Sequence, residues 1–280
     1  MKTHTTVITG ANSGIGKETA RRIANDGGRL IMIARSKDRG EAAQIELIET
    51  TKNPNIELLI ADLSLMEDVR KVSEELHQKT DKIDVLINNA GFMGYPERTL
   101  TKEGIEATVA TNHLGPFLLT RLNEDLINAS EYARVIFVSS VAHSLGNLDF
   151  DDLEMEKEYK VFNAYSNTKF MNVLCTEEYA RRRADSHITF NSLHPGNVST
   201  NIAHSYSKWF RFLYELGRPF LTSARNSGKT SYRLATDPKL EGVSGKYFSD
   251  SKMKPAKNKQ LNEENAAKLW DWSEKRVGLV

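Results

Sequence analysis

Short apolar runs alternate with longer amphipathic stretches along most of the chain. Val, Ile and Leu dominate these runs, which is typical of strands buried inside a sheet. The runs span residues 5–8, 30–33, 56–61, 83–87, 135–138, 188–193 and 245–248. This alternation predicts right-handed crossovers and a single doubly wound α/β domain over residues 1–280, with seven mainly parallel strands and helices on both faces.

Helical periodicity fills most of the intervals between the runs. The first helix is expected from Ile15 to the Gly27-Gly28 pair, and the others over 39–51, 65–79, 103–129, 164–183 and 224–236. We expect Gly115-Pro116 to interrupt the helix at 103–129, because proline lacks an N–H group. The tail, residues 249–280, is expected to end in a helix capped at Asn262 that docks Trp270 and Trp272.

Composition narrows the classes of function. The 280 residues include 38 basic and 37 acidic side chains, so nothing indicates a nucleic-acid groove or a polyanionic substrate. The single cysteine, Cys175, is expected to be a core thiol, and the seven histidines form no recognisable metal motif. No metal site is therefore expected. Without a leader-like or 18-residue apolar stretch, the expectation is a soluble cytoplasmic protein.

A glycine-rich loop follows the first apolar run. Gly10, Gly14 and Gly16 lie between a predicted strand and a predicted helix. In that position glycines let a pyrophosphate approach the backbone and the helix N-terminus, so a dinucleotide is the expected ligand. The spacing differs from the commonest fingerprint, and a plain glycine turn is the alternative.

The end of the second run bears on the choice of cofactor. An acidic residue here would bind the ribose 2′-hydroxyl of NAD, whereas arginine accommodates the 2′-phosphate of NADP. This chain has Arg35, followed by Lys37. We therefore predict NADP(H), with NAD(H) less favoured. Alternatively, both are solvated residues at the start of the next helix.

Polar and small residues recur in a fixed order after the later runs. They are Asn88-Asn89-Ala90-Gly91, Asn112, Ser139-Ser140, Tyr165 with Lys169, and 195–200 (Pro-Gly-Asn-Val-Ser-Thr). With the glycine loop, this order closely resembles the short-chain dehydrogenase/reductase family over about residues 3–250. The long interval between Ser140 and Tyr165, with Val-Ser-Ser-Val-Ala-His before it, is similar to the retinol dehydrogenase-like branch.

The resemblance implies a Rossmann-type fold and a set of site residues. The implied catalytic residues are Asn112, Ser140, Tyr165 and Lys169. The implied cofactor-binding residues are Gly10, Asn12, Ser13, Gly14, Ile15, Gly16, Arg35, Asp62, Leu63, Asn89, Ala90, Gly91, Tyr165, Lys169, Pro195, Gly196, Val198 and Thr200. In the family the asparagine exposes a carbonyl that holds a water leading from the lysine to solvent. His113 and His194 are expected to have packing or backbone roles.

Tyr165 and Lys169 are four residues apart, so on a helix they share one face. Lowering the pKa of a phenol from about 10 to about 7 needs roughly 4 kcal/mol. The positive charges of the Lys169 ammonium and of an oxidised nicotinamide could supply this energy, because both favour the phenolate over the phenol. Tyr165 would then exchange a proton with the alcohol or carbonyl oxygen that Ser140 also binds. Taken alone, a tyrosine and a lysine four residues apart could equally be two exposed side chains on a helix.

Aromatic residues crowd the segment 201–222, which breaks the regular β/α pattern. We interpret it as a substrate lid, with a membrane contact or ordinary core as alternatives.

The predicted function is NADP(H)-dependent interconversion of an alcohol and a carbonyl, with reduction of a lipophilic aldehyde or ketone favoured. Two alternatives are a catalytically silent NADP(H)-sensing protein that docks a partner through 201–222, and a nucleotide-sugar epimerase. Peripheral membrane contact and homo-oligomerisation stay open.

Overall fold

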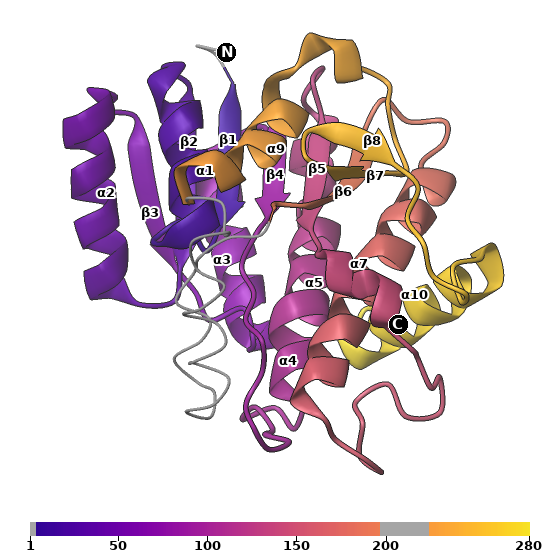
Figure 1. Cartoon of the computed structure of the whole chain (residues 1–280). Coiled ribbons are helices and arrows are strands. Elements are labelled where there is room, and N and C mark those ends of the chain that lie inside the picture. Colours follow the sequence, from indigo (N-terminus) through magenta and orange to yellow (C-terminus); the bar gives the residue numbers. More distant parts are fainter. Residues whose placement is uncertain (1–3, 197–223) are drawn as a thin grey trace.

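An eight-stranded sheet forms the centre of the computed structural model, which describes residues 4–196 and 224–280 (Figure 1). The strand order is β3-β2-β1-β4-β5-β6-β7-β8, and β1 to β7 run parallel. The strands are β1 (Thr5–Thr9), β2 (Arg29–Ala34), β3 (Ile56–Ile60), β4 (Val85–Asn88), β5 (Arg134–Val138), β6 (Thr189–His194), β7 (Lys246–Ser249) and β8 (Lys252–Lys254). The doubly wound α/β class is confirmed.

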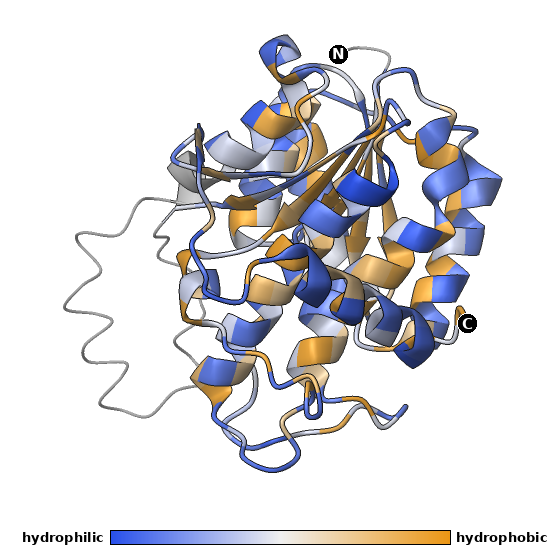
Figure 2. Cartoon of the chain, turned by 90° about the vertical axis from the view of Figure 1, so that its right-hand side faces the viewer, coloured by the Kyte–Doolittle hydropathy of each residue, from blue (hydrophilic) through white to orange (hydrophobic). Residues whose placement is uncertain are grey.

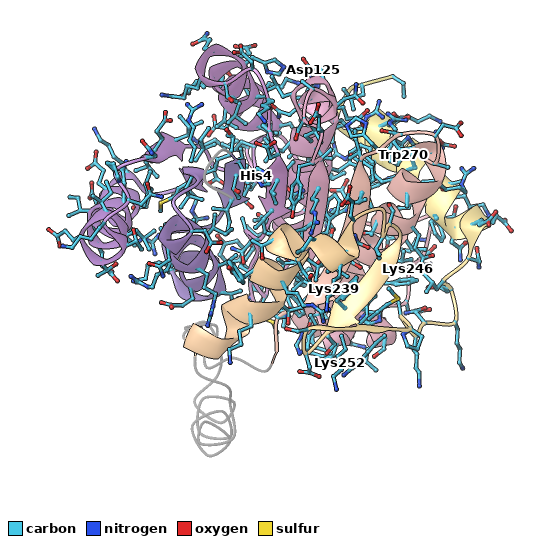
Figure 3. The ribbon with its side chains drawn as sticks, turned by 90° about the horizontal axis from the view of Figure 1, so that it is seen from above. His4, Asp125, Lys239, Lys246, Lys252 and Trp270 are labelled. Atoms are coloured by element: carbon cyan, nitrogen blue, oxygen red, sulfur yellow. The ribbon has the colours of Figure 1, made fainter. Side chains whose placement is uncertain are left out.

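The predicted count of seven strands was one too low. β8 pairs antiparallel with β7 at the outer edge of the sheet. All three of its residues are exposed, and two are lysines, so no apolar pattern marked it as a strand. Figure 3 shows Lys246 and Lys252 at this edge. Exposed lysines are a common feature of edge strands, where they discourage pairing with other chains.

Helices cover both faces of the sheet. They are α1 (Gly14–Asn25), α2 (Lys37–Thr51), α3 (Met66–Lys79), α4 (Ala107–Val109), α5 (Gly115–Leu122), α6 (Glu124–Asn128), α7 (Val161–Arg182), α9 (Ala224–Thr236) and α10 (Glu263–Arg276). Helices α1, α2 and α9 pack on one face, and α3, α5, α7 and α10 pack on the other. Figure 2 shows the apolar strands enclosed between these two layers. No helix within 4–196 or 224–280 is both long and apolar enough to cross a membrane.

The core follows the alternation of side chains along each strand. Val7 points into the face covered by α3 and α5, while its neighbour Ile8 points into the face covered by α1. Cys175 is buried and free, as expected. In α10, Asn262 caps the first turn and Trp270 is buried, with its ring edge-on to the Tyr179 ring, so this expectation is confirmed for Trp270; Trp272 is partly buried.

The helix predicted over 103–129 is shorter and more broken than expected. Glu103 belongs instead to the start of α3, because its carboxylate accepts hydrogen bonds from the backbone of Met66 and Glu67 at 2.7 and 3.0 Å. Helix begins at Ala107, and a π-helical turn, Ala110–Leu114, leads into α5 with Pro116 in its first turn. The chain breaks again at Asn123, between α5 and α6.

Candidate active site

The glycine loop connects β1 to α1 and leaves little space for side chains. Gly10 and Gly14 have φ of +67° and +54°, a region that favours glycine. A Cβ at Gly16 would lie 2.3 Å from the carbonyl oxygen of Gly10, so only glycine lets α1 start this close to β1. Ser13 is exposed and its side chain caps no backbone group, while Asn12 and Ile15 are half-buried beside it. This cradle of backbone N–H groups fits a pyrophosphate.

Thr9 joins the glycine loop to the end of β4, and sequence reasoning missed it. Its hydroxyl accepts hydrogen bonds from the backbone N–H groups of Asn89 and Ala90, both at 2.9 Å. The Asn89 amide donates to the Thr9 carbonyl at 2.8 Å. Asn89 therefore steadies the central strands, in addition to the cofactor-binding role that the resemblance implies for it. A threonine directly before the first glycine was the available signal.

Arg35 and Asp62 lie at the ends of neighbouring strands, β2 and β3. The closest approach between the guanidinium and the carboxylate is 3.9 Å, and the Arg35 side chain is 62% exposed. The other carboxylate oxygen of Asp62 accepts hydrogen bonds from the backbone and hydroxyl of Ser64. The Leu63 side chain is buried in the core on the α3 and α5 face. The Arg35 guanidinium is thus largely exposed, where an anion can reach it.

Ser140, Tyr165 and Lys169 come together where β5 ends. Ser140 begins a 3₁₀ turn, Val141–Leu145, and hydrogen-bonds the hydroxyl of Tyr165. The Lys169 ammonium lies 5.6 Å from the centre of the Tyr165 ring and donates to the Val138 carbonyl at 3.0 Å. Both residues belong to α7, and the predicted shared face is confirmed.

Burial sets the protonation states at this cluster. It raises the pKa of Tyr165, and the hydrogen bond with Ser140 opposes that rise. It also lowers the pKa of Lys169 to about 8, because water is excluded from the ammonium. The protein's own groups therefore do not produce the lowered tyrosine pKa expected from the sequence. At neutral pH the phenol is protonated and the lysine is mostly charged.

Ser139 fixes α7 against β5. Its buried hydroxyl donates to the Lys169 carbonyl at 2.6 Å. The two adjacent serines thus divide their roles, since Ser140 meets Tyr165 and Ser139 holds the helix backbone. Sequence analysis pointed to both serines, but it did not predict the contact of Ser139 with the Lys169 carbonyl.

Asn112 holds the loop that follows β4 against Lys169. Its amide pairs with both backbone groups of Phe92 at 2.9 Å and donates to the Thr168 hydroxyl at 3.1 Å. A Cβ at Gly91 would lie 3.0 Å from the Asn112 side-chain oxygen and 3.2 Å from the Lys169 ammonium. The backbone carbonyl of Asn112 accepts a hydrogen bond from the Asn172 amide at 2.9 Å. The structure therefore brings all four expected catalytic residues to one edge of the sheet.

The remaining predicted residues follow β6. Pro195 is buried and Gly196 has a φ of +97°. Val198, Thr200 and the segment 201–222 lie outside the described residues. Within 4–196 and 224–280, no group of three His, Cys, Asp or Glu side chains is arranged to hold a metal ion.

Comparison with known proteins identifies the class. Residues 4–211 match the family model described as short chain dehydrogenase. Retinol dehydrogenase 12 of Homo sapiens is 40% identical over 273 residues, which cover 98% of this chain and 86% of the relative. The chain therefore belongs to the short-chain dehydrogenase/reductase family, in its retinol dehydrogenase-like branch. It is an oxidoreductase that acts on an alcohol and carbonyl pair.

Solved structures agree with this fold. An uncharacterized protein from Mycobacterium paratuberculosis is 31% identical, with a TM-score of 0.79, and the match covers 98% of this chain and 93% of the other. A 3-ketoacyl-(acyl-carrier-protein) reductase from Brucella melitensis, complexed with NADH, is 23% identical, with a TM-score of 0.68 and coverage of 88% and 96%. This second likeness speaks for the fold alone. The relatives carry the names of enzymes, so the silent-sensor alternative gains no support.

Proposed function

We propose that the protein reduces a lipophilic aldehyde or ketone with NADPH. The observation that carries this proposal is the cluster of Ser140, Tyr165 and Lys169 at the sheet edge that also holds the glycine loop. A nicotinamide cofactor supplies the hydride when bound. The residues of this chain would hold the substrate oxygen and deliver its proton.

The protonation states suit the direction of reduction. Burial keeps the pKa of Tyr165 high, so its phenol can donate a proton to the carbonyl oxygen as that oxygen gains negative charge. Ser140 would hydrogen-bond the same oxygen, and the Lys169 ammonium would stabilise the phenolate left behind. Asn112 would keep Gly91 against the ammonium.

Arg35 supports the choice of NADPH over NADH. It directly follows β2, and the next basic side chain, Lys37, is 72% exposed. A guanidinium here can pair with a 2′-phosphate, whereas an NAD-binding site has an acidic residue at the end of this strand.

Exposed apolar side chains on the segments that lead to the site residues support a lipophilic substrate. They stand on the loop after β4, on the turn after β5 and at the start of α7, and they are Tyr95, Val141, Leu145 and Phe162. Their side chains are 43%, 50%, 65% and 46% exposed. Apolar side chains exposed on these segments favour a substrate that is mostly hydrocarbon. We propose that the aromatic residues of 201–222 also contribute to substrate selection.

Substitution of Arg35 tests the cofactor choice. Arg35→Ala should weaken NADPH binding by about 1.5–3 kcal/mol, the worth of a charge-assisted hydrogen bond, and leave NADH binding nearly unchanged. Lys37→Ala is the matched control, because it removes a neighbouring positive charge. Equal affinity of the unmodified protein for both cofactors would contradict the proposal.

A panel of carbonyl compounds tests the reaction. Retinal, a steroid ketone and a long aliphatic aldehyde are each incubated with NADPH, and cofactor absorbance is followed. We expect turnover that rises with the apolar surface of the substrate. Tight NADPH binding without turnover of any carbonyl would favour the sensor instead.

A further inference from the structure

Two buried histidines, His143 and His113, lie next to the proposed catalytic residues Ser140 and Asn112. His143 follows Ser140 by three residues, and its Nδ1 lies 2.6 Å from the Ser140 carbonyl. A carbonyl can only accept, so Nδ1 carries the proton. The backbone N–H of Lys257 approaches the other nitrogen, Nε2, at 3.4 Å, which requires a lone pair there. His143 is therefore neutral and bonded on both sides.

The tail also holds this turn by a second route. The Asn258 amide donates to the carbonyls of His143 and Gly146, both at 2.8 Å. The turn that carries Ser140 thus depends on residues more than 100 positions later in the chain. The His143 ring also packs on the Tyr247 ring, with ring centres 4.5 Å apart.

His113 makes a parallel connection to Asn112. The Asn172 amide donates to the Asn112 carbonyl, so the Asn172 oxygen faces His113 Nδ1 at 3.4 Å. The other ring nitrogen, Nε2, lies 2.9 Å from the Ser273 hydroxyl, which also bonds the Leu269 carbonyl at 2.7 Å. Burial lowers the pKa of His113 to about 4, which agrees with a neutral ring.

The Asn112 carbonyl needs this support for a local reason. In a regular helix it would accept from the residue four positions later, which is Pro116 and has no N–H. The hydrogen bond from Asn172 replaces the missing one. Contacts thus run from Ser273 on α10 through His113 and Asn172 to Asn112.

We propose that the C-terminal segment 257–273 holds the active site in shape, and that His143 and His113 are positioning residues that transmit its support to Ser140 and Asn112. The proposal rests on the proposed function for the roles of Ser140 and Asn112. In this proposal the C-terminal segment supports the catalytic residues in addition to packing against the core.

A pair of substitutions at His143 tests the first connection. His143→Asn places an amide nitrogen near the position of Nδ1 and can still donate to the Ser140 carbonyl, whereas His143→Ala cannot. With NADPH and retinal as the probe, we expect His143→Ala to lower kcat by about tenfold, since displaced catalytic groups lose rate steeply, with NADPH affinity unchanged. His143→Asn should recover most of that loss. Equal loss in both variants, or no loss in the alanine variant, would overturn the proposal.

Ser273→Ala tests the connection from α10 through His113 to Asn112. It keeps the proposal testable if the His143 variants fail to fold. The control is Ser73→Ala, which removes a buried hydroxyl that likewise bonds the carbonyl four residues back, on α3. We expect a lower kcat for Ser273→Ala than for Ser73→Ala at equal thermal stability. Equal kcat would count against the proposal.

Hydrogen exchange separates this proposal from the proposed function. Amide exchange over residues 140–146 should be faster in His143→Ala than in the unmodified protein and the Ser73→Ala variant. If the unmodified protein reduces no carbonyl, the proposed function fails while this measurement still reports on the support. Unchanged exchange would overturn the support itself.

Discussion

The two halves of the site are held together in different ways. On the cofactor side, around β1, α1 and β4, close packing depends on the absence of side chains, as at Gly16, and the hydroxyl of Thr9 binds backbone N–H groups. On the catalytic side, around β5 and α7, they depend on buried polar side chains whose partners lie far away in the chain, as for His113 and Ser273. The first half should therefore fail by steric clash, and the second by loss of specific hydrogen bonds or charge.

The largest expected effect is on the catalytic side. Tyr165→Phe should lower kcat by about 10²–10⁴-fold, the usual contribution of a general acid, while NADPH affinity stays close to that of the unmodified protein. Tyr159→Phe is the control, because its hydroxyl bonds the Tyr95 carbonyl and the side chains of Thr108 and Glu106, none of which belongs to the catalytic set. Steady-state kinetics and cofactor titration of both variants give the comparison. A similar kcat in the two would remove Tyr165 from the reaction.

The same contrast explains what the sequence could predict. Gly10, Gly14, Gly16, Tyr165 and Lys169 were found because spacing along one strand or helix determines where they lie. The class of fold followed from apolar runs. The strand β8 could not be found, because an exposed edge strand needs no apolar pattern.

Long-range supports were also out of reach of the sequence. The contacts of His143 with Lys257 and of His113 with Ser273 depend on how the tail folds back over α7, and no local spacing encodes that path. Glu103 was misplaced for a similar reason, since it caps a helix that precedes it by more than 30 residues.

The next effect is on stability in acid. The folded pKa of His113 is about 4 against an ordinary 6.5, so the unfolded chain binds an extra proton between these values and stability falls as the pH falls. This difference in pKa lowers the free energy of unfolding by about 3 kcal/mol at a pH below both values. Urea unfolding at neutral and acid pH should show a shallower loss for His113→Phe than for the unmodified protein.

His77 provides the opposite case as a control. A hydrogen bond to the Ser73 carbonyl, and then Asp125, raise the pKa of His77, so its stabilisation is present in acid and is lost as the pH rises through the folded pKa. His77→Phe should therefore make the loss in acid steeper. Identical slopes in both variants would show that burial of His113 does not control the acid response.

On the cofactor side, one added methyl group should be enough to disturb both the fold and NADPH binding. Gly16→Ala would place Cβ against the Gly10 carbonyl, which cannot move without the loop, and should destabilise the fold by about 1–3 kcal/mol and weaken NADPH binding. Gly40→Ala on α2 is the matched control, since its Cβ would meet the flexible end of Leu58 at 2.9 Å and the Ala34 methyl group at an ordinary contact distance of 3.4 Å. Thermal melts with and without NADPH distinguish the two. A Gly16→Ala variant that binds NADPH normally would contradict the cradle.

The smallest effect concerns the charge on Lys169. Burial lowers the pKa of Lys169 to about 8, so the ammonium loses its proton just above neutral pH. If that charge stabilises the Tyr165 phenolate formed on proton donation, kcat/KM for carbonyl reduction should be constant below this pKa and fall by about tenfold one unit above it. Lys169→Arg keeps a charge at all accessible pH values, so its activity, though lower, should not fall over this range. A pH profile of both proteins, measured at saturating NADPH, makes the comparison. A decline of the same shape in both would assign the titration to another group, whereas a decline confined to the lysine enzyme places the charge on the reaction path.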